Sequence, residues 1–83
     1  MEELQIRKTI LRKLVYMNKW GGAHTSLDNL PKGFPGHIRG DVKDVAKQLI
    51  KENLLISKPT SYGIEVSLNP EKKKEIEELV RDL

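Results

Sequence analysis

Apolar residues recur every three or four positions in two stretches of the chain, residues 3–20 and residues 37–53. This spacing places the apolar side chains along one side of an α-helix, whereas a half-buried strand would alternate them with polar residues. The first stripe runs from Leu4 to Met17 and the second from Ile38 to Ile50. The sequence therefore predicts two long amphipathic helices, each with one face available for burial.

Glycine, asparagine and hydroxyl residues predict where these helices end. The pair Gly21-Gly22 is expected to stop the first helix, because glycine disfavours helix continuation and accepts positive φ. Asn53 is expected to stop the second in the left-handed conformation. Between them, Thr25 or Ser26 can cap a helix of at most two turns over residues 27–30. Just before that cap, residues 23–25 can form a short extended segment that joins a sheet.

The pattern changes to strand-like alternation after Asn53. Residues 54–56 and 64–68 are β-prone and flank the polar tip 60–63, which predicts a hairpin. Gly63 is expected to supply the positive φ of the turn. Pro59 lacks an amide donor, which suits a turn margin or a sheet edge and argues against long pairing at that point.

A last helix is predicted over residues 70–83. Asn69 provides an N-cap, and Pro70 suits the first helical position. The apolar residues of this segment form one stripe: Ile76, Leu79, Val80 and Leu83.

Length and composition favour one α+β domain over residues 1–83. The chain has 83 residues, 37% hydrophobic and 33% charged, and no cysteine. The lack of cysteine excludes disulfides, thiolate zinc sites and a catalytic thiol, and fits a reducing compartment. No long apolar run or signal peptide is present, so we expect a cytoplasmic protein without a membrane partner. The large side chains Tyr16, Trp20 and Phe34 are expected in or beside the core.

Charge adds a functional indication on the helix predicted over residues 37–53. The chain carries a net charge of +3, a mild bias toward polyanions. At about 100° per residue, Arg39, Lys43 and Lys47 share one ridge beside the apolar stripe, whereas Asp41 and Asp44 lie on the other side. Such segregation suits contact with phosphates or base edges. The alternative is a solvated helix face whose charges happen to be sorted.

Gly40 is an unusual choice in the first turn of that helix. Glycine costs about 1 kcal/mol there relative to alanine. It marks either the close approach of a ligand or another backbone, or a packing concession to a neighbouring helix.

No pattern indicates catalysis or a cofactor. His24 and His37 are far apart and have no second ligand at helical metal spacing, so no metal site is predicted. Asp41 and Asp44 could share a helix face, but acid–base chemistry also needs a pocket, so ordinary solvation is the expectation. Phosphate loops, dinucleotide fingerprints and nucleophile motifs are absent from the sequence. We therefore expect neither enzymatic activity nor catalytic residues.

The order of these elements resembles a winged helix-turn-helix domain over nearly the whole chain. The stretch "ENLLISKPTSYGIEVSLNP" is most similar to small prokaryotic and archaeal regulators, whereas the inter-helix turn "PKGFPG" is longer than usual. The resemblance implies a three-helix core, a wing hairpin of two or three strands, and an added C-terminal helix. That helix, residues 70–83, would close the core or form a homodimer.

The family resemblance also implies a function, binding double-stranded DNA as a sequence-specific or general regulator of transcription. Residues 37–53 would enter the major groove, and residues 54–68 would touch the backbone or minor groove. The implied DNA-binding residues are Lys32, His37, Arg39, Lys43, Lys47, Lys58, Thr60, Ser61 and Tyr62. Tyr62 would either stack on a sugar or base or fold back beside Pro59. A module that binds an acidic protein partner, or RNA, is the alternative.

Overall fold

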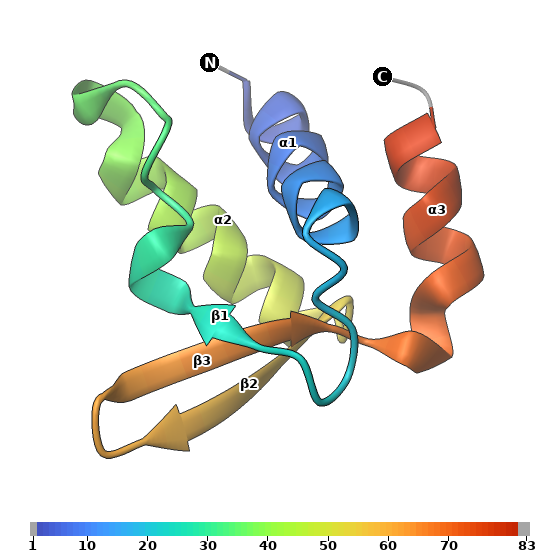
Figure 1. Cartoon of the computed structure of the whole chain (residues 1–83). Helices are drawn as coiled ribbons and strands as arrows, with labels where there is room; N and C mark the ends of the chain where they lie inside the picture. Colours follow the sequence, from blue (N-terminus) through green and yellow to red (C-terminus); the bar gives the residue numbers. More distant parts are fainter. Residues whose placement is uncertain (1, 82–83) are drawn as a thin grey trace.

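Residues 2–81 are described by a computed structural model that combines helices with a small antiparallel sheet (Figure 1). The α+β class expected from the sequence is confirmed. The α-helices are α1 (Glu3–Tyr16), α2 (Arg39–Lys51) and α3 (Lys73–Arg81), and the strands are β1 (Thr25–Ser26), β2 (Leu55–Thr60) and β3 (Gly63–Leu68). Single 3-10 turns are η1 (Leu27–Asn29), η2 (Gly36–Ile38) and η3 (Pro70–Lys72). None of the helices within residues 2–81 combines the length and apolar character needed to cross a membrane.

The sheet has the strand order β1-β3-β2, and both pairings are antiparallel. Strands β2 and β3 pair over their whole length, from Leu55 opposite Leu68 to Thr60 opposite Gly63. Pro59 lies inside this ladder opposite Ile64, so the expectation that it would shorten the pairing is wrong. The reason is that β2 is an edge strand, where proline can turn its missing donor to the open side.

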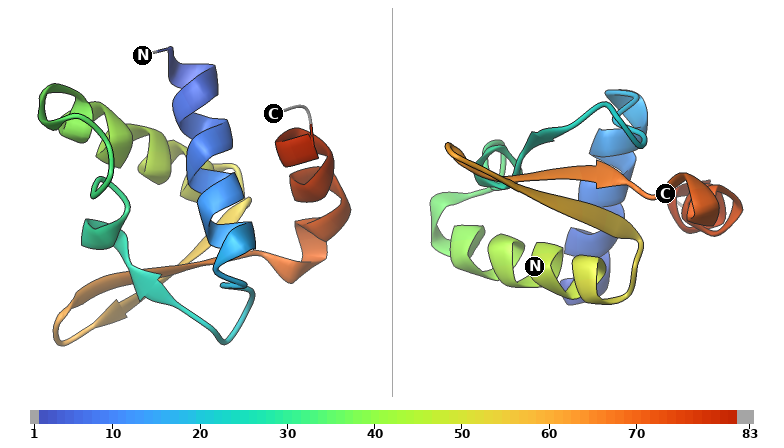
Figure 2. Two further views of the ribbon diagram at one scale, coloured as in Figure 1. Left: turned by 45° about the horizontal axis from the view of Figure 1, so that its top comes forward. Right: turned by 90° about the horizontal axis from the view of Figure 1, so that it is seen from below.

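The helices pack on the sheet and on one another around a single core. Figures 1 and 2 show α1 between α2 and α3, with the sheet beneath them. The fully or nearly fully buried side chains of this core come from every layer: Ile6, Ile10, Leu11, Leu14, Val42, Ala46, Leu49, Leu55, Val66, Leu68 and Ile76. The two periodic stripes predicted from the sequence therefore face each other across α1 and α2.

The first helix ends earlier than predicted, at Tyr16 rather than at Trp20. Asn18 adopts φ 57°, and the amides of Asn18 and Lys19 donate back to the carbonyls of Val15 and Leu14. This is the left-handed helix stop for which glycine was expected. The helix cannot continue because the next residues join the sheet: the Leu68 amide donates to the Lys19 carbonyl at 2.7 Å.

The short elements show similar local control. The helix expected over residues 27–30 is a single 3-10 turn, and Ser26 is its cap, with its hydroxyl accepting from the Asp28 amide. The second long helix also starts later than predicted, because η2 occupies residues 36–38. Its end is as predicted: Asn53 is left-handed at φ 64°.

Among the large side chains, one expectation about burial is wrong. Phe34 is buried and Trp20 packs against the core, but Tyr16 is 91% exposed. Tyr16 follows the buried Leu14 by two positions, about 200° around the helix, so its ring points away from the core. The exposure of Tyr16 is therefore set by its position around the helix, although a small domain has few aromatic side chains to bury.

The C-terminal segment begins at the predicted cap and packs inward. The side chain of Asn69 accepts from the Glu71 amide and donates to the Asn53 carbonyl at 2.8 Å, which ties η3 to the end of α2. Ile76 is fully buried, and Leu79 and Val80 pack partly against the core. Leu83, the last residue of the predicted stripe, lies outside the described residues. Ile76 is therefore used within the chain, and a homodimer through residues 70–83 stays a prediction.

Candidate nucleic-acid interface

A groove of about 420 Å³ separates the η1 region from the N-terminal half of α2. Its lining consists of Asp28, Pro31, Lys32, Arg39, Gly40 and Lys43. Three of the implied DNA-binding residues thus meet in one place, although Lys32 and Lys43 are distant in sequence. Three cations and one carboxylate leave the groove with a net positive charge.

Tight turns hold Lys32 against α2. The Phe34 amide donates to the Pro31 carbonyl, the Ile38 amide donates to the Pro35 carbonyl, and Gly33 takes φ 94° between them. Phe34 is buried beneath this segment and anchors it. The long turn that departs from the family pattern is therefore a compact series of turns that forms one wall of the groove.

Two of the three cations in the groove contact only neutral acceptors among the described residues. Lys32 Nζ donates to Asn29 Oδ1 at 3.0 Å. Arg39 Nε donates to the Phe34 carbonyl at 3.4 Å, and its terminal amino groups make no hydrogen bond within residues 2–81. Neither side chain forms an ion pair within residues 2–81, although the charge of Lys32 contributes, after that of Lys43, to the lowered pKa of Asp28.

Lys43 differs, because a carboxylate already contacts it. Its Nζ lies 2.8 Å from Asp28 Oδ1, and both side chains are largely open to solvent. The hydrogen bond from Lys43, reinforced by its charge, holds the pKa of Asp28 below its ordinary value. At neutral pH Asp28 is thus a full negative charge inside a basic groove.

Gly40 lines the groove without packing against anything. A Cβ built on Gly40 would meet no neighbouring atom within 4 Å. The reading of this glycine as a packing concession to a neighbouring helix is therefore wrong, since no such neighbour exists within the described residues. Its backbone φ is not in the left-handed region, so conformation does not require glycine either.

The other basic residues extend this surface along α2. Lys47 and Lys51 are exposed on the turns that follow Lys43. His37 is exposed in η2, one turn before the groove, and does not line it.

The hairpin tip is a second, separate part of the candidate surface. Residues 56–64 are all exposed, so the outer half of the hairpin extends beyond the core. Figures 1 and 2 show the tip and the N-terminal half of α2 at the same end of the molecule, away from α3. Tyr62 is 97% exposed, so it does not fold back beside Pro59. Ser61 is exposed beside it.

Two hairpin residues have roles that their types alone did not reveal. The Thr60 hydroxyl donates to the Gly63 carbonyl at 2.7 Å and accepts from the Tyr62 amide, so it holds the turn together, and Gly63 has the predicted positive φ of 124°. Lys58 lies opposite Glu65 in the ladder. Strand alternation places Lys58 on the face opposite to that of the buried Leu55, and therefore away from the helices.

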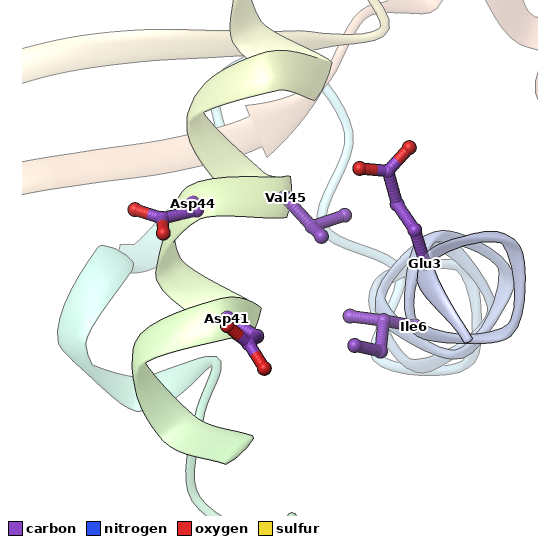
Figure 3. Close-up of a pocket in the computed structure, with 5 residues that line it drawn as sticks. All are labelled: Glu3, Ile6, Asp41, Asp44 and Val45. Carbon is purple, nitrogen blue, oxygen red and sulfur yellow. The ribbon is translucent and has the colours of Figure 1, made fainter. Parts of the chain in front are cut away.

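The opposite side of α2 is acidic. Glu3, Asp41 and Asp44, together with Ile6 and Val45, line a cavity of about 260 Å³ between α1 and α2 (Figure 3). A cavity beside the two aspartates was not expected from the sequence. It forms between two helices, and the sequence does not show that Glu3 of α1 lies near Asp41 and Asp44 of α2. In Figure 3 Asp44 extends from the side of α2 that is away from α1, so the carboxylates do not converge. Within residues 2–81, no cluster of three or more acidic or histidine side chains could hold a metal ion.

The basic and acidic sides of α2 thus face different neighbours, and the groove on the basic side holds two cations that form no ion pair within residues 2–81. This arrangement can receive a phosphate-bearing polymer on one side of the helix and repel it on the other. No protein-family model, curated protein or solved structure matches this chain.

Proposed function

We propose that this protein is a winged helix-turn-helix module that binds double-stranded DNA and regulates transcription. In this proposal α2 enters the major groove, and the β2–β3 hairpin is the wing on the backbone or minor groove. The observation that carries it is the groove in which Lys32 and Arg39 present positive charge without a direct ion pair among the described residues, at the start of an exposed basic helix side.

The dimensions and chemistry of α2 fit this role. Its 13 residues span about 20 Å, and the major groove of DNA is wide enough to admit one α-helix. Lys43 and Lys47 follow Arg39 at intervals of one turn, so their side chains point to the same side. The Arg39 guanidinium has free terminal donors, which can bind a phosphate or the acceptor edge of guanine.

The hairpin supports the proposal through its exposure. Its outer half is free of the core, and Tyr62 at the tip presents its whole ring to solvent. An exposed aromatic ring can stack on a sugar or base. Lys58 would reach phosphates from the outer face of the hairpin, apart from the groove cations.

NMR titration of the ¹⁵N-labelled protein with a random DNA duplex at low salt tests the proposal and locates the surface. We expect amide shifts at Lys32, Gly33, Phe34 and Gly36, in the first turns of α2 and at the hairpin tip. Amides of α3 serve as the internal control, because α3 lies at the other end of the molecule. Shifts centred on α3, or no shifts at all, would reject the proposal.

A protein-interaction module is the second candidate, because the hairpin exposes Ile56 and Ile64 as well as Tyr62. Salt dependence separates the two functions. If four or five phosphates are neutralised, the logarithm of the DNA association constant should fall against the logarithm of the salt concentration with a slope of about −4. Fluorescence anisotropy of a labelled duplex measures this slope when the salt concentration is varied from about 50 to about 200 mM. An absence of duplex affinity at the lowest salt favours the interaction module.

RNA binding is tested in the same assay by competition. The major groove of an RNA duplex is too narrow and deep for a helix to enter. An unlabelled RNA duplex should therefore compete much more weakly than an unlabelled DNA duplex of the same length. Equal competition would favour the RNA-binding alternative.

A further inference from the structure

Among the described residues, Asp28 is the only acidic one that lines the groove. It contacts Lys43, one of the cations that the groove would offer to a ligand. Its carboxylate contacts Lys43 at 2.8 Å, while Lys32 and Arg39 contact only neutral acceptors. An aspartate that served only solubility could be placed anywhere on the surface. Asp28 instead contacts a cation of the proposed binding surface. Any anion that binds Lys43 must therefore compete with Asp28.

We infer that the groove between η1 and α2 receives one backbone phosphate of the bound duplex, and that the Asp28 carboxylate occupies Lys43 until that phosphate displaces it. This inference rests on the proposed function and names the site of one contact within it. Asp28 then competes with the phosphate for Lys43.

Replacing the Asp28 carboxylate by a phosphate leaves the charge next to Lys43 unchanged. A phosphate diester and an aspartate carboxylate each carry one negative charge and accept hydrogen bonds from an ammonium group. When the phosphate takes Lys43, Asp28 returns to solvent, to which its side chain is already 73% exposed. The released carboxylate and the phosphate repel each other, so the exchange is favourable only if the phosphate gains further contacts.

Lys32 and Arg39 provide those further contacts. Both residues line the same groove, and neither is paired with an acid within residues 2–81. An anion that reaches all three cations gains more than it loses to Asp28, whereas an anion that touches Lys43 alone only replaces one carboxylate. Asp28 therefore makes binding depend on correct seating in the groove.

Gly40 is consistent with a phosphate in this position. It lines the groove, and a Cβ on it would touch nothing in the protein. A side chain there would instead project into the open groove and occupy space near the helix backbone. Glycine leaves that space free for a close approach of the sugar–phosphate chain.

The first test compares Asp28→Asn with Glu78→Gln, which makes the same change in net charge on α3 at the other end of the molecule. Asp28→Asn should raise affinity for a random duplex about three- to fivefold at low salt, the usual range for releasing an exposed ion pair. The salt slope should stay close to that of the wild-type protein, because Lys43 neutralises the same phosphate in both proteins and the counterions are released from the DNA. Glu78→Gln should change affinity by less than about twofold, as expected for a distant screened charge.

A second background isolates the contact with Lys43. In a Lys43→Ala protein, adding Asp28→Asn should raise affinity by less than it does in the wild-type protein, because the ion pair is already absent. An equal gain in both backgrounds, or a gain no larger than that of Glu78→Gln, would overturn the inference.

Gly40→Ala gives an independent readout in which stability and binding move in opposite directions. Alanine should raise the melting temperature by about 3–5 °C, because it favours the helix and meets no neighbour. Duplex affinity should nevertheless fall about tenfold, equivalent to one misplaced contact. Unchanged affinity with a raised melting temperature would show that no phosphate approaches this turn.

Failure of this inference differs from failure of the proposed function. If the wild-type protein does not bind duplex DNA at low salt, both are wrong. If it binds with the expected salt slope, yet Asp28→Asn behaves like Glu78→Gln, only the phosphate seat and the competition from Asp28 are wrong.

Discussion

Replacing Arg39 and Lys43 together with alanine is expected to lower the affinity for duplex DNA about 100- to 1,000-fold at low salt. Each side chain offers a charge-assisted contact to a phosphate or base, worth about 1–3 kcal/mol in such interfaces. Removing Lys43 also leaves the Asp28 carboxylate without its partner in the groove. That unpaired negative charge faces the incoming phosphates and adds to the loss. Fluorescence anisotropy with a labelled random duplex measures the change.

A matched control separates local contact from overall charge. Lys72→Ala with Lys74→Ala removes the same two positive charges from exposed positions at the start of the C-terminal helical segment. This pair should lower affinity by less than about fivefold, because screening limits distant charges. Both double variants should unfold in urea near the wild-type midpoint, since Arg39 and Lys43 are exposed and make only weak internal contacts. Equal losses in the two variants would contradict a specific role for α2.

The second large effect is expected on stability. Ile76→Ala should lower the free energy of unfolding by about 3 kcal/mol, because its side chain is completely buried where α3 packs on the rest of the core. For a domain of this size that loss is a large part of the total stability. Urea denaturation followed by circular dichroism measures it.

The same experiment tests whether the apolar stripe of the last helix is a dimer seam. If Ile76 stabilises the single chain, the urea midpoint of the wild-type protein and the deficit of the variant should not depend on protein concentration. A midpoint that rises with concentration, together with dissociation of the variant into monomers in analytical ultracentrifugation, would show that Ile76 contributes to a homodimer instead. Leu79→Ala is the comparison variant. Because the Leu79 side chain is half-buried, its loss should lower the free energy of unfolding of the single chain by less than the loss of Ile76 does.

If α2 binds DNA as proposed, its segregated charge would also set the direction of docking. Its acidic side faces the cavity beside α1, whereas its basic side opens on the groove beside η1. Repulsion on the acidic side and attraction on the basic side would orient the helix before any base is contacted. Electrostatics would therefore align the protein on the duplex, and the groove would then position it.

Local chemistry predicted several features correctly. Ser26 and Asn69 cap their helical turns, Asn53 ends α2, and Gly63 takes positive φ in the hairpin. These outcomes depend on interactions within a few residues, so residue type and order were enough. The periodic stripes on α1 and α2 were identified for the same reason.

Other features depended on residues that are distant in the chain. The first helix ends at Tyr16 because Trp20 forms a bridge with Leu68 at the end of the sheet, with the Lys19 carbonyl accepting from the Leu68 amide. Asp28 was missed as a partner of Lys43 because no periodicity links positions fifteen residues apart. The face of Lys58 followed from strand register, and register is set by pairing with β3.

The sequence by itself determined the class of the domain, the order of its elements, the caps at Ser26 and Asn69, the helix stop at Asn53 and the concentration of positive charge on one side of a helix. Only the tertiary structure decided which cations meet in one groove, which of them an acid already contacts, and which hairpin face Lys58 occupies. The physical reason is that periodicity and capping act over one or two turns of chain. A groove and its charge balance arise when distant segments are brought together by burial of a common core.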